Sequence, residues 1–178
     1  GLGRIGQATA KLLNALDMKV LAYDAYQSEA GAKLAEYVSL DELFAQSDVI
    51  FLHCPLFPAT EGIINKENIA KMKDGVILVH TSRGGLICTE DLIAGIRDHK
   101  FFAVGLDVYE EESDFVYEDM SDQILDRSTM ARLLSFPNVM VTSHQGFFTR
   151  EALEAISRIT LENAAAFEKG ETLENEVT

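Results

Sequence analysis

The residue types best suited to acid–base chemistry and to carboxylate binding occur in three short stretches of the chain. HTSRGG spans residues 80–85, LDVYEEES spans 106–113 and TSHQGFF spans 142–148. Arginine offers a planar fork of donors that matches a carboxylate, and histidine has an unperturbed pKa that suits proton donation near neutral pH. A neighbouring acid would favour the protonated form of the histidine. The three stretches therefore indicate carboxylate binding combined with proton transfer.

Each stretch also has a purely structural interpretation when it is taken alone. Arg83 could pair with a surface acid, His144 could cap a strand, and the glutamates could simply be solvated. What favours a functional site is that all three stretches follow predicted strands, because open α/β sheets bind their ligands at the carboxyl ends of the strands. We therefore predict that the three stretches converge on one site.

A glycine-rich turn at residues 1–6, GLGRIG, matches the G-x-G-x-x-G pattern that lets a dinucleotide pyrophosphate approach a helix N-terminus. The spacing alone is weak evidence, but Asp24 ends the strand after the first predicted helix, 18 residues beyond Gly6. An acid there can accept hydrogen bonds from the adenosine ribose and repel a 2′-phosphate, which favours NAD over NADP. The alternative is a solvated acid at a strand end.

The elements that must position these residues alternate between helices and strands. The apolar spacing predicts a helix from residue 4, and the capping box of Ser39 with Glu42 predicts another over 39–47. Thr89 is the expected cap of a helix over 89–99. Further helices are predicted at 65–72, 126–136 and 149–170, and strands at 19–24, 48–54, 75–81, 102–109 and 138–144.

Strands this continuously apolar predict an α/β fold, a doubly wound parallel sheet with crossover helices on both faces. Residues 110–137 do not fit the alternation and are interpreted as an insertion, and the helix over 149–170 has no strand after it. In the strand order 3-2-1-4-5-6 the strand before the glycine turn is central. We therefore expect a further strand before Gly1, and we expect the chain to be a segment of a longer protein.

Composition narrows the classes of function. The 178 residues carry a net charge of −14, which disfavours binding to nucleic acid or to an anionic membrane. The long apolar run at 49–57 is far shorter than the roughly 20 residues that span a bilayer, so a cytoplasmic protein is expected. Cys54 and Cys88 lack metal-ligand spacing, and we expect both to be buried, reduced thiols with no metal site.

The ordered motifs resemble those of the D-isomer-specific 2-hydroxyacid dehydrogenases over nearly the whole chain. They are GLGRIG, LAYDAY, LHCPL, TSRGGLI, GLDVYEEE and TSHQGFFT. Within that family, the insertion and the ending LENAAAFEKGETLENEV most resemble the fermentative D-lactate dehydrogenases of bacteria. The resemblance implies a Rossmann-like NAD-binding domain at 1–148 that lacks its first strand. Residues 149–178 would be a C-terminal helix and tail that return to a mostly absent substrate domain.

The resemblance also implies roles for individual residues. Arg83 would hold the 2-oxoacid carboxylate, His144 would give the proton to the carbonyl oxygen, and Glu112 would orient the histidine. Phe147 would face the substrate side chain. The implied NAD-binding positions are Gly1, Gly3, Arg4, Ile5, Gly6, Asp24, Cys54, Pro55, Thr60, Thr81, Ser82 and Asp107, with packing as the rival role of Cys54 and Thr60.

Three positions depart from the family pattern. His80 stands in place of the usual asparagine, Cys88 in place of a common aspartate, and Ser113 in place of the proline that commonly follows the glutamate. His80 ends a predicted buried strand, which favours a satisfied core histidine over a second acid. Neither His80 nor Cys88 removes a catalytic role, and Ser113 agrees with the insertion of the lactate type.

The resulting prediction is NAD-dependent reduction of pyruvate to D-lactate, with a small 2-oxoacid or 2-hydroxyacid as the substrate and a homodimer as the assembly. One alternative is another D-2-hydroxyacid dehydrogenase, of the 2-hydroxyisocaproate or the hydroxypyruvate/glyoxylate reductase type. A second is an NAD-sensing interaction protein without catalysis, and a third is a plain dinucleotide-binding domain.

Overall fold

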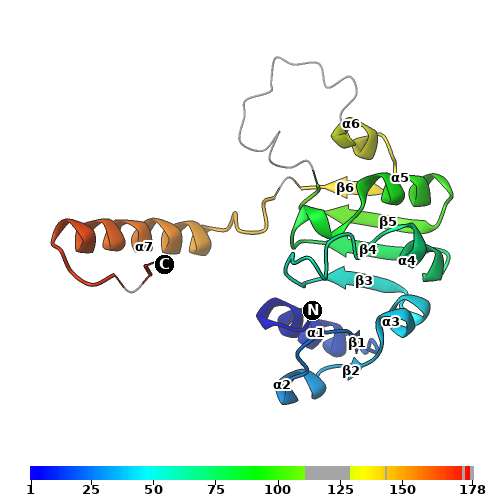
Figure 1. Cartoon of the computed structure of the whole chain (residues 1–178), viewed down its shortest axis with the longest axis horizontal. Coiled ribbons are helices and arrows are strands. Elements are labelled where there is room, and N and C mark those ends of the chain that lie inside the picture. Colours follow the sequence, from blue (N-terminus) through cyan, green and yellow to red (C-terminus); the bar gives the residue numbers. More distant parts are fainter. Residues whose placement is uncertain (111–128, 143, 174, 177–178) are drawn as a thin grey trace. The chain divides into compact units, whose positions relative to one another are not determined.

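Helices and strands alternate along the first of two units into which the contacts divide the chain (Figure 1). The computed structural model describes residues 1–110, 129–142, 144–173 and 175–176. The first unit comprises Gly1–His144 and the second Gln145–Thr178. Most of the insertion predicted at 110–137 lies outside the described residues.

The first unit holds most of the secondary structure. Its elements are α1 (Arg4–Ala15), β1 (Leu21–Ala22), α2 (Glu29–Ala32), β2 (Glu36–Tyr37), α3 (Leu40–Gln46), β3 (Val49–Leu52), α4 (Lys66–Lys71), β4 (Val76–His80), the 3₁₀ helix η1 (Gly84–Leu86), α5 (Thr89–Arg97), β5 (Phe101–Leu106), α6 (Thr129–Leu134) and β6 (Val139–Val141). All the predicted strands form, although each is shorter than predicted. The sequence analysis did not predict α2, β2 or η1.

The strands form two parallel sheets. β1 pairs with β2, and the larger sheet has the order β3-β4-β5-β6. In its register Leu52 lies beside His80, His80 beside Leu106, and Leu106 beside Val141. Because every pairing is parallel, the carboxyl ends of β3 to β6 meet at one edge, as the sequence analysis expected.

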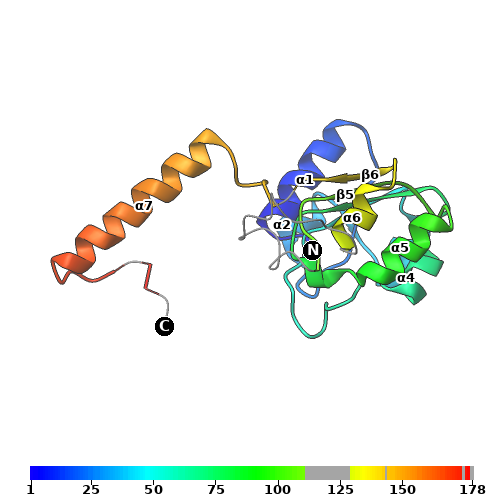
Figure 2. The same ribbon diagram turned by 90° about the horizontal axis from the view of Figure 1, so that it is seen from above.

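One face of the larger sheet holds the core. Strand residues such as Ile50, Leu78 and Val104 are buried there against side chains from α3, α4, α5 and α6. Residues on the opposite face, such as Val49 and Ile77, are only half-buried. α1 lies on the other side of the sheets from α4 and α5 (Figure 2). The helices therefore lie on both sides, as in a doubly wound fold, but within the described residues only one face of the larger sheet is fully covered.

The first residues of two helices can be compared with the predicted caps. The cap of α3 is the predicted one, and the cap of α5 lies one residue earlier than predicted. At α3 the Ser39 hydroxyl accepts from the Glu42 amide and the Glu42 carboxylate accepts from the Ser39 amide, which confirms the capping box. Thr89 is the first residue of α5 and not its cap, which corrects the prediction. The cap position is Cys88, whose side chain makes no capping bond, and the Thr89 amide donates to the Glu110 carboxylate at 3.2 Å.

The second unit contains α7 (Arg150–Glu168), the helix predicted at 149–170. The Thr149 hydroxyl caps it by accepting from the Ala152 amide at 3.2 Å. No residue of α7 is buried, so its apolar side chains are left exposed within the described residues. Within the ranges that the structure describes, no helix is both long enough and apolar enough to cross a membrane.

Candidate functional site

The three glycines of the G-x-G-x-x-G turn meet two different steric conditions. A Cβ on Gly1 would lie 2.6 Å from the Cys54 nitrogen, and a Cβ on Gly6 would lie 2.2 Å from the Gly1 oxygen. These two glycines let the turn pack against the end of β3 and let α1 pack against the turn. A Cβ on Gly3 would have nothing within 4 Å. Gly3 therefore faces open space, which is where a pyrophosphate would approach the backbone.

The amino end of α1 is suited to an anion. Arg4 and Ile5 form its exposed first turn, which contains no acidic residue, and Gly3 offers no side-chain cap. The first N–H groups of a helix lack partners within the helix, and the helix dipole adds positive potential there. These donors are therefore suited to a phosphate, which is the role that the resemblance implies for Arg4 and Ile5.

Asp24 lies just after β1 and connects that strand to the glycine turn. Its Oδ2 accepts from the Leu2 amide at 2.6 Å, and its Oδ1 accepts from the Tyr26 amide at 2.9 Å. Partial burial raises the pKa of Asp24, but these backbone hydrogen bonds outweigh it and hold the pKa below the ordinary value. The carboxylate is therefore charged near neutral pH and fixed beside the glycine turn, and it is not a freely solvated strand-end acid.

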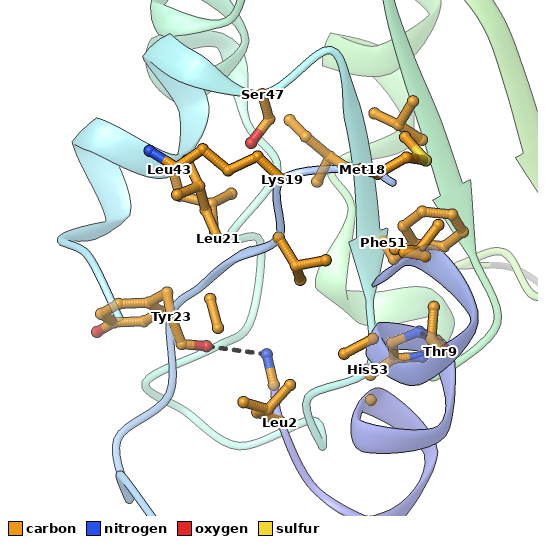
Figure 3. A pocket seen from close by; sticks show the side chains of 18 of the residues that line it. Leu2, Thr9, Met18, Lys19, Leu21, Tyr23, Leu43, Ser47, Phe51 and His53 are labelled. Carbon is orange, nitrogen blue, oxygen red and sulfur yellow. Dashed lines mark hydrogen bonds between the residues drawn. The ribbon is translucent and has the colours of Figure 1, made fainter. Parts of the chain in front are cut away.

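A cavity of about 420 Å³ lies between β1 and β3, which do not pair with each other (Figure 3). Leu21 and Tyr23 line it from one side, Phe51 and His53 from the other, and Thr9 from α1. The Gly1 amino group donates to the Tyr23 carbonyl at 2.9 Å at one end of the cavity. None of Arg83, Asp107 and His144 lines this cavity, so it is a gap between sheets and not the predicted catalytic site.

His53 links α1 to the carboxyl end of β3, a contact that the sequence analysis did not identify. Its Nε2 lies 3.1 Å from the Thr9 hydroxyl, and its ring stacks on Phe51 with 6.0 Å between ring centroids. Burial lowers the pKa of His53, which favours the neutral ring. The signal that could have found this contact is that His53 immediately follows β3, while Thr9 lies in α1 three residues after the glycine turn that packs against the end of β3.

The turn that carries Arg83 is fixed to three neighbouring segments. The Ser82 hydroxyl donates to the Leu52 carbonyl of β3 at 2.9 Å, and His80 Nε2 lies 2.9 Å from the Arg83 carbonyl oxygen. A Cβ on Gly84 would lie 2.0 Å from the Tyr109 oxygen, so the turn packs closely against the chain after β5. The Arg83 side chain stays exposed, and its Nη1 donates to the Ser82 carbonyl at 2.8 Å.

Asp107 connects the end of β5 to the segment that holds His144. The buried Asp107 carboxylate accepts from the Thr142 hydroxyl, and the Asp107 carbonyl accepts from the His144 amide. His144 has φ of 55°, in the left-handed region that non-glycine residues seldom adopt. Such strain persists where surrounding bonds impose it, and it clusters at functional sites. The Asp107 amide in turn donates to the His80 carbonyl at 2.8 Å, which ties β5 to β4.

The remaining predicted cofactor positions lie on loops at the same edge. Cys54 is half-buried and Pro55 is exposed, and the Thr60 hydroxyl donates to the Pro55 carbonyl at 2.7 Å. Thr60 therefore closes this loop, which supports the packing alternative for it. Thr81 is exposed beside the half-buried Ser82.

Both cysteines are free thiols, as expected. Cys88 is exposed, however, so the expectation that both are buried was wrong for this residue. It lies at the start of α5, where the chain turns on the surface. In the part of the chain that the structure describes, no group of three or more histidine, cysteine or acidic side chains is arranged to hold a metal.

Two predicted site residues do not belong to the described part of the first unit. Glu112 lies outside the described residues, so its predicted role stays a prediction. Phe147 belongs to the second unit, where its ring makes an edge contact with Phe148 at 6.2 Å between centroids. Glu110, the neighbouring acid, accepts from the Thr89 amide at the start of α5.

The fold, the glycine turn and the residues at the sheet edge define a dinucleotide-binding domain, and comparison with known proteins gives its family. Residues 1–146 match the family described as D-isomer specific 2-hydroxyacid dehydrogenase, NAD binding domain. The chain belongs to this family, and NAD is the cofactor of its domain.

Individual relatives are similar over almost the whole chain. A D-lactate dehydrogenase of Escherichia coli is 44% identical over 178 residues, which cover 99% of this chain and 54% of that protein. A hydroxypyruvate reductase of Blautia hydrogenotrophica is 48% identical over 96% of this chain and 49% of its own length. The crystal structure of D-lactate dehydrogenase with NAD⁺ from Lactobacillus jensenii has a TM-score of 0.89 and 34% identity, over 100% of this chain and 54% of that one. The chain thus spans about half the length of these relatives.

Proposed function

We propose that the full-length protein is an NAD-dependent dehydrogenase that reduces pyruvate to D-lactate. The observation that carries the proposal is the hydrogen-bonded connection of the Arg83 turn, Asp107 and His144 at one sheet edge of an NAD-binding domain. Family membership supports the class of reaction, and the D-lactate dehydrogenase of Escherichia coli supports the substrate.

The residues present fit the dinucleotide. Gly3 leaves room for the pyrophosphate, the start of α1 offers amide donors, and Asp24 is charged beside the glycine turn. NADH, when bound, supplies the hydride that adds to the substrate carbonyl carbon. Ribose hydroxyls would donate to Asp24, and a 2′-phosphate would be repelled by it.

The protein's own residues supply substrate binding and the proton. The exposed guanidinium of Arg83 would donate two hydrogen bonds to the 2-oxoacid carboxylate, which orients the adjacent carbonyl. His144 would donate a proton to the carbonyl oxygen as the hydride arrives, and would remove it in the reverse direction. Glu112 would orient the imidazole and favour its protonated form. One hydride and one proton thus convert the C=O group to a CH–OH group.

A second candidate is reduction of a different 2-oxoacid at the same site. The 48% identity to a hydroxypyruvate reductase favours it, because this identity is as high as that to the D-lactate dehydrogenase. A methylene more or less in a substrate pocket changes the discrimination by only about 1 to 3 kcal/mol. The third candidate, NAD sensing without catalysis, would leave Arg83 and His144 without a chemical role.

The test follows NADH absorbance at neutral pH with the full-length protein and four acids in parallel. These are pyruvate, 2-oxobutyrate, 2-oxoisocaproate and hydroxypyruvate. We expect pyruvate to give the highest kcat/KM and the product to be D-lactate. A higher kcat/KM for another acid would move the assignment to the second candidate. NADH binding without reduction of any acid would refute the enzyme assignment and favour NAD sensing.

The domain organisation and the assembly are also proposals. We propose that residues 1–148 form the NAD-binding domain with one further parallel strand seated between β1 and β3, and that 149–178 pack on a substrate domain. The gap between β1 and β3 supports this strand, because it would complete the order β2-β1-new-β3-β4-β5-β6. We further propose a cytoplasmic homodimer, and light scattering on the full-length protein will give its mass.

A further inference from the structure

His80 is a polar residue in an apolar row, at the carboxyl end of β4. Buried residues alternate along this strand, so His80 points to the same face as Val76 and Leu78. Its exposed fraction is 0%, like that of Leu78. A polar ring in such a place is costly unless it forms hydrogen bonds, so what the ring bonds to determines its role.

The ring forms one hydrogen bond, to the backbone of the turn that carries Arg83. His80 Nε2 lies 2.9 Å from the Arg83 carbonyl oxygen. A carbonyl oxygen can only accept, so Nε2 carries the hydrogen and donates it. Within the described residues Nδ1 is buried without a hydrogen-bond partner. These surroundings therefore favour the neutral tautomer of His80 that carries its hydrogen on Nε2.

The Arg83 carbonyl oxygen is shared between two donors, one before it and one after it along the chain. The Leu86 amide donates to it at 3.1 Å in closing η1, and His80 supplies the second hydrogen bond. On the same turn the Ser82 hydroxyl is bonded to β3, and Gly84 packs against the Tyr109 backbone. The backbone at Arg83 is thus held from β3, from β4 and from the end of β5, while its guanidinium remains exposed.

We propose that His80 is a positioning residue that holds the Arg83 turn through the Nε2–H bond, so that the guanidinium meets the substrate carboxylate in a fixed direction. This inference rests on the proposed function, because it assumes that Arg83 binds the 2-oxoacid. It adds a role for His80, a fully buried residue to which the sequence analysis assigned no catalytic or binding role. A shift of about 1 Å in a substrate-binding group can cost on the order of 100-fold in rate.

The test compares three variants of the full-length protein. His80→Leu removes the donor and keeps an apolar side chain, whereas His80→Gln restores an amide donor that can reach the same carbonyl. Leu78→Met is the control, since it alters packing on the same strand and face without any hydrogen bond. KM and kcat for the 2-oxoacid are measured together with the Kd of NADH.

The His80 variants are expected to change catalysis with the 2-oxoacid and not the binding of NADH. His80→Leu should lower kcat/KM for the 2-oxoacid by roughly 10- to 100-fold. It should leave the Kd of NADH within about twofold, because the lost bond is to the Arg83 carbonyl, while Ser82 keeps its own hydrogen bond to Leu52. His80→Gln should recover most of the loss, and Leu78→Met should behave like the wild type. Equal losses in His80→Leu and His80→Gln would overturn the proposal, as would an equal loss of NADH affinity.

A second readout does not depend on activity. Hydrogen–deuterium exchange of a peptide covering residues 81–88 should be faster in His80→Leu than in the wild type, and near the wild-type rate in His80→Gln. Unchanged exchange in His80→Leu would overturn the positioning role. If the wild type reduces no 2-oxoacid, the proposed function fails, and the exchange result still decides whether His80 holds this turn.

Discussion

The Leu2 amide donates to Asp24 Oδ2 at 2.6 Å, so the acid that would read the adenosine ribose also holds the glycine turn. The two roles use different properties of one carboxylate. The hydrogen bond needs an acceptor oxygen, whereas rejection of a 2′-phosphate needs the negative charge. The roles can therefore be separated by substitution.

Asp24→Asn and Asp24→Ala should affect the choice of cofactor differently. The asparagine keeps an acceptor oxygen for the Leu2 amide, so NADPH should bind more tightly while the Kd of NADH rises only a few-fold. The alanine loses the acceptor as well, and a lost hydrogen bond to a charged group costs about 1.5–3 kcal/mol, or roughly 10- to 100-fold in Kd. Fluorescence titrations with NADH and NADPH measure both. Identical Kd values in the two variants would contradict the holding role of Asp24.

Gly3→Ala and Gly6→Ala form a matched pair within one turn. A methyl group on Gly3 has nothing within 4 Å, so this variant should keep its Tm within about 1 °C and yet bind NADH at least about tenfold more weakly. A methyl group on Gly6 would lie 2.2 Å from the Gly1 oxygen, so the Tm should fall by several degrees along with the affinity. Thermal melts and NADH titrations separate the two effects. Unimpaired NADH binding by Gly3→Ala would show that the pyrophosphate does not bind at this turn.

His144→Asn tests proton transfer without releasing the backbone strain. Asparagine tolerates the left-handed region, so the φ of 55° at this position can persist. Loss of the general acid should lower kcat by about 100- to 10,000-fold, with the Kd of NADH little changed. His99→Asn is the matched control, because His99 is exposed and has φ of 57°. It should retain wild-type kcat, and a similar loss in both variants would mean that the effect is structural.

His80 predicts how stability depends on pH. Burial lowers its pKa from 6.5 to about 4, and the hydrogen bond to the Arg83 carbonyl only partly offsets the burial. Between pH 6.5 and pH 4 the unfolded chain binds a proton at His80 and the folded chain does not. The free energy of unfolding is therefore highest above pH 6.5 and decreases as the pH falls toward 4. The loss amounts to about 3 kcal/mol at most.

The measurement is the free energy of urea unfolding between pH 7 and pH 4.5, for the wild type and His80→Gln. The wild type should lose more stability over this interval than the variant does. His53 also has a lowered pKa and contributes in the same direction to both proteins, so the difference between the two isolates His80. Parallel curves would show that His80 takes up a proton without cost to the fold.

Sequence patterns predicted those features that depend on neighbours along the chain. The capping box of Ser39 and Glu42 is present as predicted, since both of its hydrogen bonds lie within three residues. Thr89 was misassigned because the acceptor for its amide is Glu110, from another part of the chain. The short α2 and β2 lack the repeated apolar spacing on which the prediction depended.

At the sheet edge, the strand ends predicted the neighbouring positions of the Arg83 turn, Asp107 and His144, but not the bonds that fix them. His80 was expected to be a satisfied core histidine; it is buried as expected, but it is bonded only at Nε2 within the described residues. The bonds of Thr9 to His53 and of Thr142 to Asp107 join residues 44 and 35 positions apart. No local pattern contains such partners, because they are set by how the strands align.

His144 is the last residue of the unit that contains the glycine turn, and its amide is bonded to Asp107 of that unit. The proposed proton donor therefore belongs to the same structural unit as the glycine turn. Residue exchanges in the segment from Gln145 onward, including Phe147, should alter which acids are accepted and leave the solvent isotope effect on proton transfer unchanged. Substitutions in one unit would then change which substrate is accepted, and substitutions in the other would change proton transfer.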